Sequence, residues 1–319
     1  MTLAGPPDLS VVIVTRDDFR SIARPVGHVQ AQTAADRIEL VIVAPSASES
    51  GVDPRALVEG GLRDARVVSS GQVVWRGRAA AVGVRASRAP IVAFVENHSY
   101  PAPRWAESLL AAHRGPWAIV GPAVENANPV THTSVVNFLL TYGRWAGRRE
   151  AAEVALLPFH NSAYKRPWLE AYGERLGEML DSEYWLQSDI RARGGRLYFE
   201  PPARTAHQNE VVLSTSLRLM FGQGRVFGNH RGEPWSPLRR AGYLLGAPAF
   251  PLLNLPRALR EAARSVSTAE LGAALPSILL HLVAHGAGEA AGYLTRSDGD
   301  EKFLAAHEFS LRSKAEERV

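Results

Sequence analysis

The chain has 319 residues, 46% of them hydrophobic, and a formal net charge of +4 at pH 7. This length exceeds what one hydrophobic core usually reaches, about 250–300 residues, so we expect one large α/β domain with an appended segment. The sequence has no cysteine, which excludes disulfides and thiolate metal sites, and its small, dispersed positive charge favours anionic ligands or an anionic membrane surface over nucleic acid.

The first part of the chain alternates between short apolar runs and a helical stretch. Residues 9–15 and 38–44 predict strands buried on both faces, and residues 17–35 have a helical pattern. A third strand is predicted at 65–69. This order predicts a mostly parallel sheet with helices on both faces, and such sheets bind ligands at the carboxyl ends of their strands. Residues 1–9 lack the pattern of a signal peptide, so we expect a cytoplasmic protein.

A polar triplet follows the fourth predicted strand. Residues 77–86 predict a helix and residues 90–95 a buried strand, which Glu96, Asn97 and His98 follow directly. Since ligands bind at the carboxyl ends of such strands, we expect the chemistry to be placed here.

The middle of the chain continues the same alternation. A helix is predicted at 103–113 and a strand at 117–120, whereas 121–129 has the composition of a loop. Residues 135–145 predict an apolar, partly amphipathic helix, and 158–164 an extended segment.

The last strand of the sheet is predicted late in the chain. Helices are expected at 166–172 and 181–193, the second ending at a Gly-Gly pair, a normal helix stop. A strand at 196–200 is expected to end at the prolines 201–202. The sheet domain should therefore finish near Asn209.

We therefore expect a sheet domain at 1–209 and a helical region at 210–319. The helical region has two apolar stretches, 241–255 and 273–284, both interrupted by prolines. Neither offers the roughly 20 uninterrupted apolar residues of a membrane-spanning helix. With arginines nearby, these stretches predict either interfacial helices on a membrane or helices packed on the domain or on a second subunit.

A collinear set of motifs resembles the inverting family-2 glycosyltransferases. The set consists of the strand Ser-Val-Val-Ile-Val-Thr, the strand Glu-Leu-Val-Ile-Val, the segment 83–86, the acidic strand end and Pro-Ala-Pro-Arg-Trp at 101–105. The resemblance runs from Leu9 to about His207 and implies a GT-A fold, a sugar-nucleotide donor, and a glycan or lipid-linked acceptor. It also implies that Trp105 lies on the acceptor side.

The strand-end motif of that family, often written DXD, holds a divalent cation against the donor diphosphate. Its positions carry Glu96, Asn97 and His98 here, so the resemblance implies a metal site of altered composition, with Asn97 near the donor. Imidazole suits Mn²⁺ better than Mg²⁺. The alternative is that Glu96 and His98 only hydrogen-bond the loop of a metal-free site. His207, where many relatives carry a histidine that contacts the metal or diphosphate, is a third ligand in this hypothesis or an ordinary structural histidine.

The family's general base is an acidic residue at the start of a late helix. The resemblance implies Glu183 for this role, with Asp181 as the alternative, and a Glu in the first turn of a helix is also favoured by the helix dipole alone. His160 and Asn161 match the segment that lines the acceptor side, although Asn161 also suits a helix cap.

Parts of the donor site depart from the family. Ala-Pro-Ser at 44–46 replaces the usual Asp-Asp-Gly-Ser, so the carboxylate that reads the base is missing. An alanine pair replaces the usual Arg-Asn, and the arginines available for the donor phosphates lie upstream, at Arg76 and Arg78. The first loop keeps Thr15, Arg16 and Asp17 where it would meet the nucleoside.

The sequence therefore predicts an inverting, metal-dependent transferase that moves a sugar from a nucleotide or polyprenyl-phosphate donor to a hydroxyl of a glycan, a lipid-linked saccharide or a secondary metabolite. Cell-envelope glycan synthesis at the inner face of the membrane fits this reading, and the helical region could make it a homo-oligomer. The alternative is a GT-A-fold protein without catalysis that binds a glycan or a partner protein.

Overall fold

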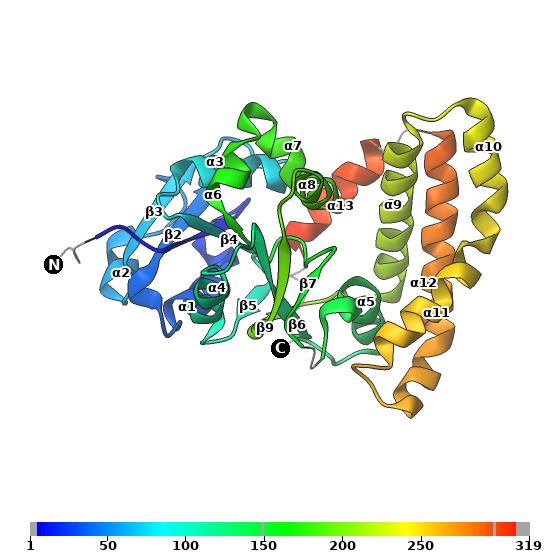
Figure 1. Ribbon diagram of the computed structural model, residues 1–319, viewed down its shortest axis with the longest axis horizontal. Helices are drawn as coiled ribbons and strands as arrows, with labels where there is room; N and C mark the ends of the chain where they lie inside the picture. Colours follow the sequence, from blue (N-terminus) through cyan, green and yellow to red (C-terminus); the bar gives the residue numbers. More distant parts are fainter. Residues whose placement is uncertain (1–4, 148–149, 296–297, 311–319) are drawn as a thin grey trace. The chain divides into compact units, whose positions relative to one another are not determined.

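The computed structural model describes residues 5–147, 150–295 and 298–310. Within these residues the chain forms two compact units. One contains residues up to 127 and 150–207, and the other contains 128–147 and the described residues from 208 to 310. We call them the sheet unit and the helical unit (Figure 1). Residues 128–147 belong to the helical unit although they lie between strands of the sheet in the sequence.

The sheet unit is built on one mixed β-sheet. Its strand order is β3-β2-β1-β4-β8-β6-β9-β5, with β7 paired to β9. The first four of these neighbours, β3, β2, β1 and β4, are parallel, whereas β8 runs antiparallel to both β4 and β6. The second half is thus less parallel than the sequence predicts. The strands are Leu9–Val14 (β1), Ile38–Ala44 (β2), Asp64–Ser69 (β3), Ile91–Val95 (β4), Ser99–Pro101 (β5), Ile119–Asn126 (β6), Ala152–Val154 (β7), Ala163–Lys165 (β8) and Leu197–His207 (β9).

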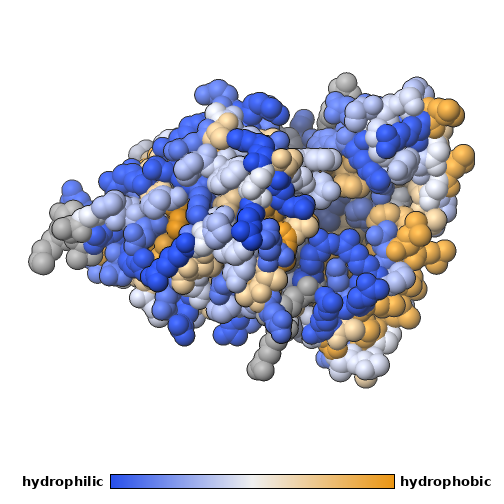
Figure 2. Space-filling view, in the orientation of Figure 1, coloured by the Kyte–Doolittle hydropathy of each residue, from blue (hydrophilic) through white to orange (hydrophobic). Residues whose placement is uncertain are grey.

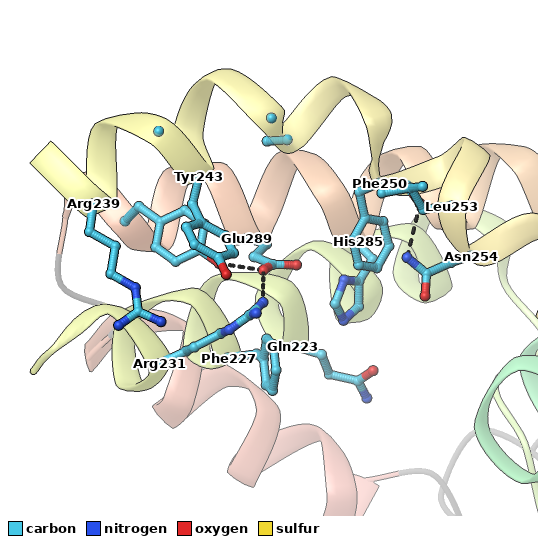
Figure 3. Close-up of a pocket in the computed structure, with 14 residues that line it drawn as sticks. Gln223, Phe227, Arg231, Arg239, Tyr243, Phe250, Leu253, Asn254, His285 and Glu289 are labelled. Carbon is cyan, nitrogen blue, oxygen red and sulfur yellow. Dashed lines mark hydrogen bonds and ion pairs between the residues drawn. The ribbon is translucent and has the colours of Figure 1, made fainter. Parts of the chain in front are cut away.

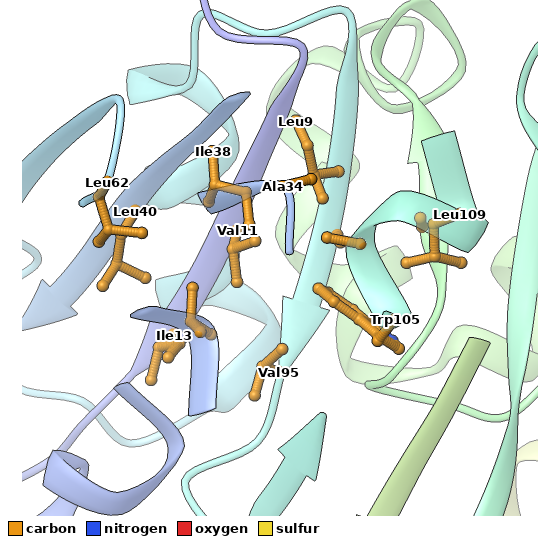
Figure 4. Close-up of a cluster of buried hydrophobic side chains, with 14 of the residues drawn as sticks. Leu9, Val11, Ile13, Ala34, Ile38, Leu40, Leu62, Val95, Trp105 and Leu109 are labelled. Carbon is orange, nitrogen blue, oxygen red and sulfur yellow. The ribbon is translucent and has the colours of Figure 1, made fainter. Parts of the chain in front are cut away.

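Helices cover both faces of this sheet (Figure 1). On one face, Leu9, Val11 and Ile13 of β1 belong to a cluster that also takes in residues of α1, α2 and α4, including Trp105 (Figure 4). On the other face, α3 packs so closely that a Cβ at Gly83 would overlap Val12. The helices of this unit are Ala23–Gln30 (α1), Pro54–Glu59 (α2), Arg76–Ala86 (α3), Trp105–Ala112 (α4), Arg166–Glu170 (α6), Leu176–Asp181 (α7) and Glu183–Ala192 (α8).

The prolines at 201–202 do not end the last strand, contrary to the sequence prediction. Strand β9 continues to His207 because its register against β6 shifts between Pro122 and Ala123, where Glu200 and Arg204 occupy successive pairing positions. The prolines fall in the resulting bulge, where no backbone N–H is needed for the ladder. In the same way β6 extends to Asn126, through most of the segment predicted as a loop.

The helical unit surrounds a long central helix, α12. Helix α12 runs over Thr268–Leu294 and packs against α5, α9, α10 and α11. The helices of this unit are His132–Tyr142 (α5), Leu213–Gly232 (α9), Pro237–Gly246 (α10), Phe250–Ala262 (α11), α12 and Asp298–Ser310 (α13). A short 3-10 turn, Ala247–Ala249, joins α10 to α11.

The prolines of the two apolar stretches differ in effect: Pro248 lies in the 3-10 turn between α10 and α11, as predicted, whereas two others do not interrupt their helices. Pro256 lies inside α11 and Pro276 inside α12, each costing one backbone hydrogen bond. Among the described residues, α12 is therefore long and apolar enough to cross a membrane by length and composition, which corrects the expectation that the stretch is too short. Core helices pass the same test, and α12 packs on four neighbouring helices.

Glycines bring α9 and α12 into close contact. A Cβ at Gly224 or Gly228 of α9 would collide with the backbone of α12, and a Cβ at Gly288 or Gly292 of α12 would collide with the backbone of α9. The two helices thus pack almost backbone to backbone, which a larger side chain at any of these positions prevents.

We expect Gly288→Ala to destabilise the protein by about 1–3 kcal/mol, because the added methyl group overlaps the carbonyl of Phe221. Gly272→Ala, on the same helix, is the matched control, since a Cβ there meets no described atom within 4 Å. This control should stabilise α12 by about 0.5–1 kcal/mol. Chemical denaturation of both variants measures the difference, and equal stabilities would contradict the close packing.

Candidate active site

The carboxyl ends of four parallel strands meet at one edge of the sheet. Ile13 of β1 pairs with Val95 of β4, so the loops that follow these strands begin side by side. Glu96, Asn97 and His98 follow β4, and β5 then pairs with the end of β9 through Ser99 and His207. The strand pairing therefore carries a histidine from far along the chain to the triplet after β4.

Glu96, His98 and His207 converge within this edge. The Nε2 atom of His98 lies 3.9 Å from Glu96 Oε1, and the Nε2 atom of His207 lies 3.4 Å from Glu96 Oε2. The two imidazole rings meet edge to face, 4.6 Å apart. All three side chains are buried, and one ligand atom from each lies within 4.8 Å of the others. Three residues that sequence analysis assigned to a metal are thus brought together.

Neighbouring polar groups fix the orientation of this cluster. The Oδ1 atom of Asn97 accepts from His98 Nδ1, 2.7 Å away, which turns His98 Nε2 toward the cluster. Glu96 Oε2 accepts from Asn161 Nδ2 at 2.6 Å and from Ser99 Oγ at 3.0 Å. Ser99 is not among the site residues predicted from the sequence. The only sequence feature that could have pointed to it is its position three residues after Glu96.

Glu96 carries its charge in this site. Burial raises the pKa of the Glu96 carboxyl, but His98, His207 and Arg76 outweigh that effect and hold the pKa well below the usual value for glutamate. The site therefore presents the Glu96 carboxylate beside the rings of His98 and His207.

This donor set fits a divalent metal ion. One carboxylate oxygen and two imidazole nitrogens are ligands that suit Mn²⁺ and similar ions better than Mg²⁺, which prefers oxygen. The Oδ1 atom of Asn161 is buried without a hydrogen-bond partner among the described atoms, next to Glu96. It gives the site an additional unsatisfied acceptor, of the kind that a ligand or its water would meet. The Glu96, His98 and His207 group can thus hold a divalent ion.

The two arginines predicted for the donor phosphates lie in different surroundings. Arg76 is buried at the start of α3, donates to the His160 carbonyl at 3.4 Å and contributes to the low pKa of Glu96. Arg78 is more than half exposed and lies 3.5 Å from Asp181. Asp181 also accepts from the backbone N–H of Gly77 at 2.7 Å, so its carboxylate caps α3. Of the two arginines, Arg76 is the one beside the cluster.

Glu183 opens α8 and holds the segment before β8. Its Oε2 atom accepts from the backbone N–H of His160 at 2.7 Å, and its Oε1 atom lies 3.1 Å from His160 Nδ1. One turn later, Gln187 accepts from Leu157 N–H at 2.8 Å. His160 has φ 61°, a left-handed conformation uncommon for residues other than glycine. Helix α8 thus holds His160 in a strained conformation with its ring on the Glu183 carboxylate, and such strain clusters at functional sites.

The first loop keeps its residues at the same sheet edge. Thr15 is buried, and its hydroxyl lies 2.6 Å from that of Ser21 and accepts from the Asp17 N–H at 3.1 Å. Asp17 itself is exposed and Arg16 is half-buried. Thr15 shapes the loop, which leaves Arg16 and Asp17 as the side chains able to meet a ligand.

Trp105 and Asn161 are not placed as an acceptor surface. Trp105 is 1% exposed and packs in the hydrophobic core of the sheet unit (Figure 4), so its ring cannot meet an acceptor. Asn161 turns its amide to Glu96 and belongs to the surroundings of the metal-binding group. The sequence alone does not distinguish a core residue from an acceptor-lining residue here. A tryptophan at the start of a helix gives the same sequence pattern whether it faces a core or a cleft.

The sequence matches no protein-family model and no curated protein. Among solved structures, the chain is similar to the mannosyltransferase PcManGT from Pyrobaculum calidifontis in complex with GDP-Man and Mn²⁺, with 17% identity, a TM-score of 0.53, and coverage of 88% of this chain and 86% of that one. The chain has a GT-A fold. A second similarity, to GalNAc-T7 with UDP, GalNAc and Mn²⁺, has 14% identity and a TM-score of 0.49, and covers 63% of this chain but only 43% of that one. At these identities the similarity establishes the fold alone.

Proposed function

We propose that the chain is an inverting, metal-dependent glycosyltransferase related to family 2, with Glu-Asn-His in place of the acidic motif. The observation that carries this proposal is the convergence of Glu96, His98 and His207 at the carboxyl edge of a GT-A sheet. The mannosyltransferase of the same fold is a complex with GDP-Man and Mn²⁺, which supports a sugar nucleotide as the donor.

The residues at this edge supply what the donor needs. When a sugar leaves its phosphate, negative charge grows on the leaving oxygen, and a divalent ion held by the cluster would neutralise part of it. Arg76, buried beside Glu96, adds a fixed positive charge to the same place. Burial strengthens these interactions, because the local dielectric is lower than that of water.

Glu183 is the proposed base in this reaction. It would take the proton of the acceptor hydroxyl as that oxygen attacks the anomeric carbon from the face opposite the leaving phosphate, which inverts the configuration. His160 is a positioning residue, because its ring and backbone N–H both hold the Glu183 carboxylate. Asp181 is bound to the N-terminus of α3, so we assign it no proton transfer.

The donor and the cellular site are narrower proposals. With Ala-Pro-Ser at 44–46 in place of a base-reading carboxylate, the donor is either a nucleotide other than the common uridine one or a polyprenyl-phosphate sugar. The acceptor is a hydroxyl of a glycan, a lipid-linked saccharide or a secondary metabolite. We place the protein in the cytoplasm, at the inner face of the membrane.

The missing base-reading carboxylate also favours a second candidate, a GT-A-fold protein without catalysis that binds a glycan or partner. Incubation with a panel of sugar nucleotides and Mn²⁺ separates the two. Release of a nucleoside diphosphate supports the transferase, whereas pyrophosphate release indicates nucleotidyl transfer. Binding of a sugar nucleotide without turnover in any acceptor extract supports the non-catalytic protein.

His160→Ala should lower kcat about 100-fold and leave the donor KM unchanged, because a misplaced base slows the chemical step without altering donor contacts. His160→Asn should recover part of this loss, since asparagine adopts the left-handed conformation readily and its amide can donate to Glu183. Steady-state kinetics of both variants test the role. If His160→Ala and His160→Asn lose the same amount of kcat and both have lowered thermal stability, His160 only supports the fold.

A further inference from the structure

The helical unit contains a cavity separate from the site at the sheet edge. Its volume is about 990 Å³, and it is lined by residues of α9, α10, the turn after α10, α11 and α12 (Figure 3). This volume is at the upper end of what small-molecule sites use, about 300–1,000 Å³. The cavity is thus large enough for a lipid-sized ligand.

The two ends of the cavity differ in chemistry. Figure 3 shows Arg239, Arg231 and Tyr243 at one end and Phe250, His285 and Leu253 at the other. His285 stacks on Phe250, with the ring centres 4.9 Å apart, and burial lowers its pKa, which keeps this end uncharged. The cavity therefore suits an amphiphile, with one charged end and one apolar chain.

The charged end has a surplus of positive charge. The Oε1 atom of Glu289 pairs with Arg231 at 3.1 Å and also accepts from the Tyr293 hydroxyl, so the charge of this carboxylate is balanced by Arg231. Arg239 makes no ion pair with a carboxylate among the described residues, and its guanidinium lies 4.3 Å from the ring centre of Trp235. The lining carries two arginines and one carboxylate, a net charge of +1 that an anionic head group would balance.

Two glycines keep the cavity open on the side of α10. Gly242 and Gly246 are one turn apart and both line the cavity, and a Cβ at either would meet no described atom within 4 Å. Glycine inside a helix costs about 1 kcal/mol relative to alanine. Packing explains the glycines between α9 and α12, whereas these two have no neighbour that requires them. Their effect is to leave room along the α10 side of the cavity.

The outer face of α10 and α11 is apolar and exposed. Leu238 and Leu245 are two helical turns apart on α10, and Leu252 follows on α11; they are 85%, 82% and 71% exposed. Leu253, 75% exposed, lies beside them and also lines the cavity, so the exposed face continues into it. Hydrophobic side chains gather over these helices in Figure 2.

The charges on this segment favour an anionic membrane as the partner. Residues 237–262 contain four arginines and a single acidic residue, Glu261. An amphipathic segment with an apolar face and basic flanks binds the interface of anionic bilayers, and each basic residue near the surface adds to the attraction. A second copy of the chain docked on this face would bring its own arginines close to these. The segment has little acidic surface to balance that positive charge.

We propose that the cavity binds an anionic phospholipid from a membrane surface on which α10 and α11 lie. The phosphate contacts Arg239, and an acyl chain passes between Phe250 and Leu253 along the space left by Gly242 and Gly246. This inference does not rest on the proposed transferase activity, because lipid binding is measured without any sugar nucleotide.

Vesicle co-sedimentation of the full chain tests the membrane contact. We expect binding to vesicles of phosphatidylglycerol with phosphatidylcholine and little binding to phosphatidylcholine alone. Leu245→Glu should reduce this binding at least about tenfold, because it puts a charge on the apolar face. Leu245 is exposed, so the fold should be kept, and thermal denaturation checks this. A concentration-dependent dimer that Leu245→Glu abolishes, with no vesicle binding, would assign the face to a second copy and overturn the proposal.

A fluorescent lysophosphatidic acid tests the cavity itself. We expect dodecyl phosphate to displace this probe and both inorganic phosphate and dodecanol to fail. Gly242→Leu should weaken probe binding at least about tenfold by filling the cavity, and Arg239→Gln about fivefold by removing one cation. Gly272→Leu, on α12 outside the cavity lining, is the matched control and should bind as the wild type does. Wild-type binding by Gly242→Leu would show that the probe sits elsewhere.

Discussion

We expect the Glu183→Gln variant to lose about 10²–10⁴-fold in kcat, the range that a general base contributes. Glutamine keeps the shape of the side chain and an oxygen that accepts from the His160 N–H, so the segment before β8 should stay in place. The amide cannot take a proton from the acceptor. The loss should therefore appear in kcat and leave the donor affinity unchanged.

The measurement is a steady-state assay with the donor that the panel identifies. Glu178→Gln is the matched control, because Glu178 is exposed on the preceding helix, α7, and should keep wild-type turnover. Equal turnover in Glu183→Gln and the wild type would remove Glu183 as the base. Thermal denaturation of the variant distinguishes a lost proton acceptor from a lost fold.

The second large effect is expected at the metal-binding group. Glu96→Gln should weaken Mn²⁺ binding at least about 100-fold, since altering even the groups that orient a ligand costs about 10–100-fold in metal affinity. The variant removes the one negative charge of the group and leaves two imidazoles. Glutamine can still accept from Ser99 and stay beside Asn161, so the buried contacts of Glu96 are largely kept.

Electron paramagnetic resonance of free Mn²⁺ measures this change directly. Glu59→Gln, an exposed site on α2, controls for a general loss of negative charge. Asn97→Ala should have a smaller effect, because it removes the hydrogen bond that orients His98 but leaves all three ligand side chains in place. Mn²⁺ binding that survives in Glu96→Gln would show that the ion sits elsewhere.

The sequence predicted the first half of the sheet closely because each strand there is a β-branched run between clear stops. Ile38–Ala44 has the predicted bounds, and Ile91–Val95 differs by one residue. The second half of the sheet was harder to predict from the sequence. Bulges and antiparallel pairings depend on partners far along the chain. Residues 121–126 therefore have the composition of a loop, and only their pairing with β9 makes them a strand.

Prolines misled the prediction twice for the same reason. Pro201 and Pro202 fit inside β9 because the bulge removes the demand for their N–H groups. Pro276 fits inside α12, where packing against α9 and α11 outweighs the loss of one hydrogen bond. Local propensity registers the cost of a proline, whereas only the tertiary structure supplies the compensation.

At the site, the sequence singled out Glu96, His98 and His207 from a resemblance, and strand pairing brings them together. It could not foresee that Asp181 caps α3, that Asn161 binds Glu96, or that Trp105 lies in the core. Each of these depends on a neighbour more than 60 residues away or on which face of a helix is buried. Short polar motifs carry no such information.

Thermal stabilisation of the wild type and of Glu96→Ala with a panel of sugar nucleotides, with and without Mn²⁺, tests the metal-assisted donor site most directly. A donor at 100 times its dissociation constant should stabilise the folded protein by about 2.7 kcal/mol. We predict a shift with one nucleotide class that requires Mn²⁺ in the wild type and is absent in Glu96→Ala. A shift of equal size in the variant, or one that ignores Mn²⁺, would contradict a metal-assisted donor site at Glu96, His98 and His207.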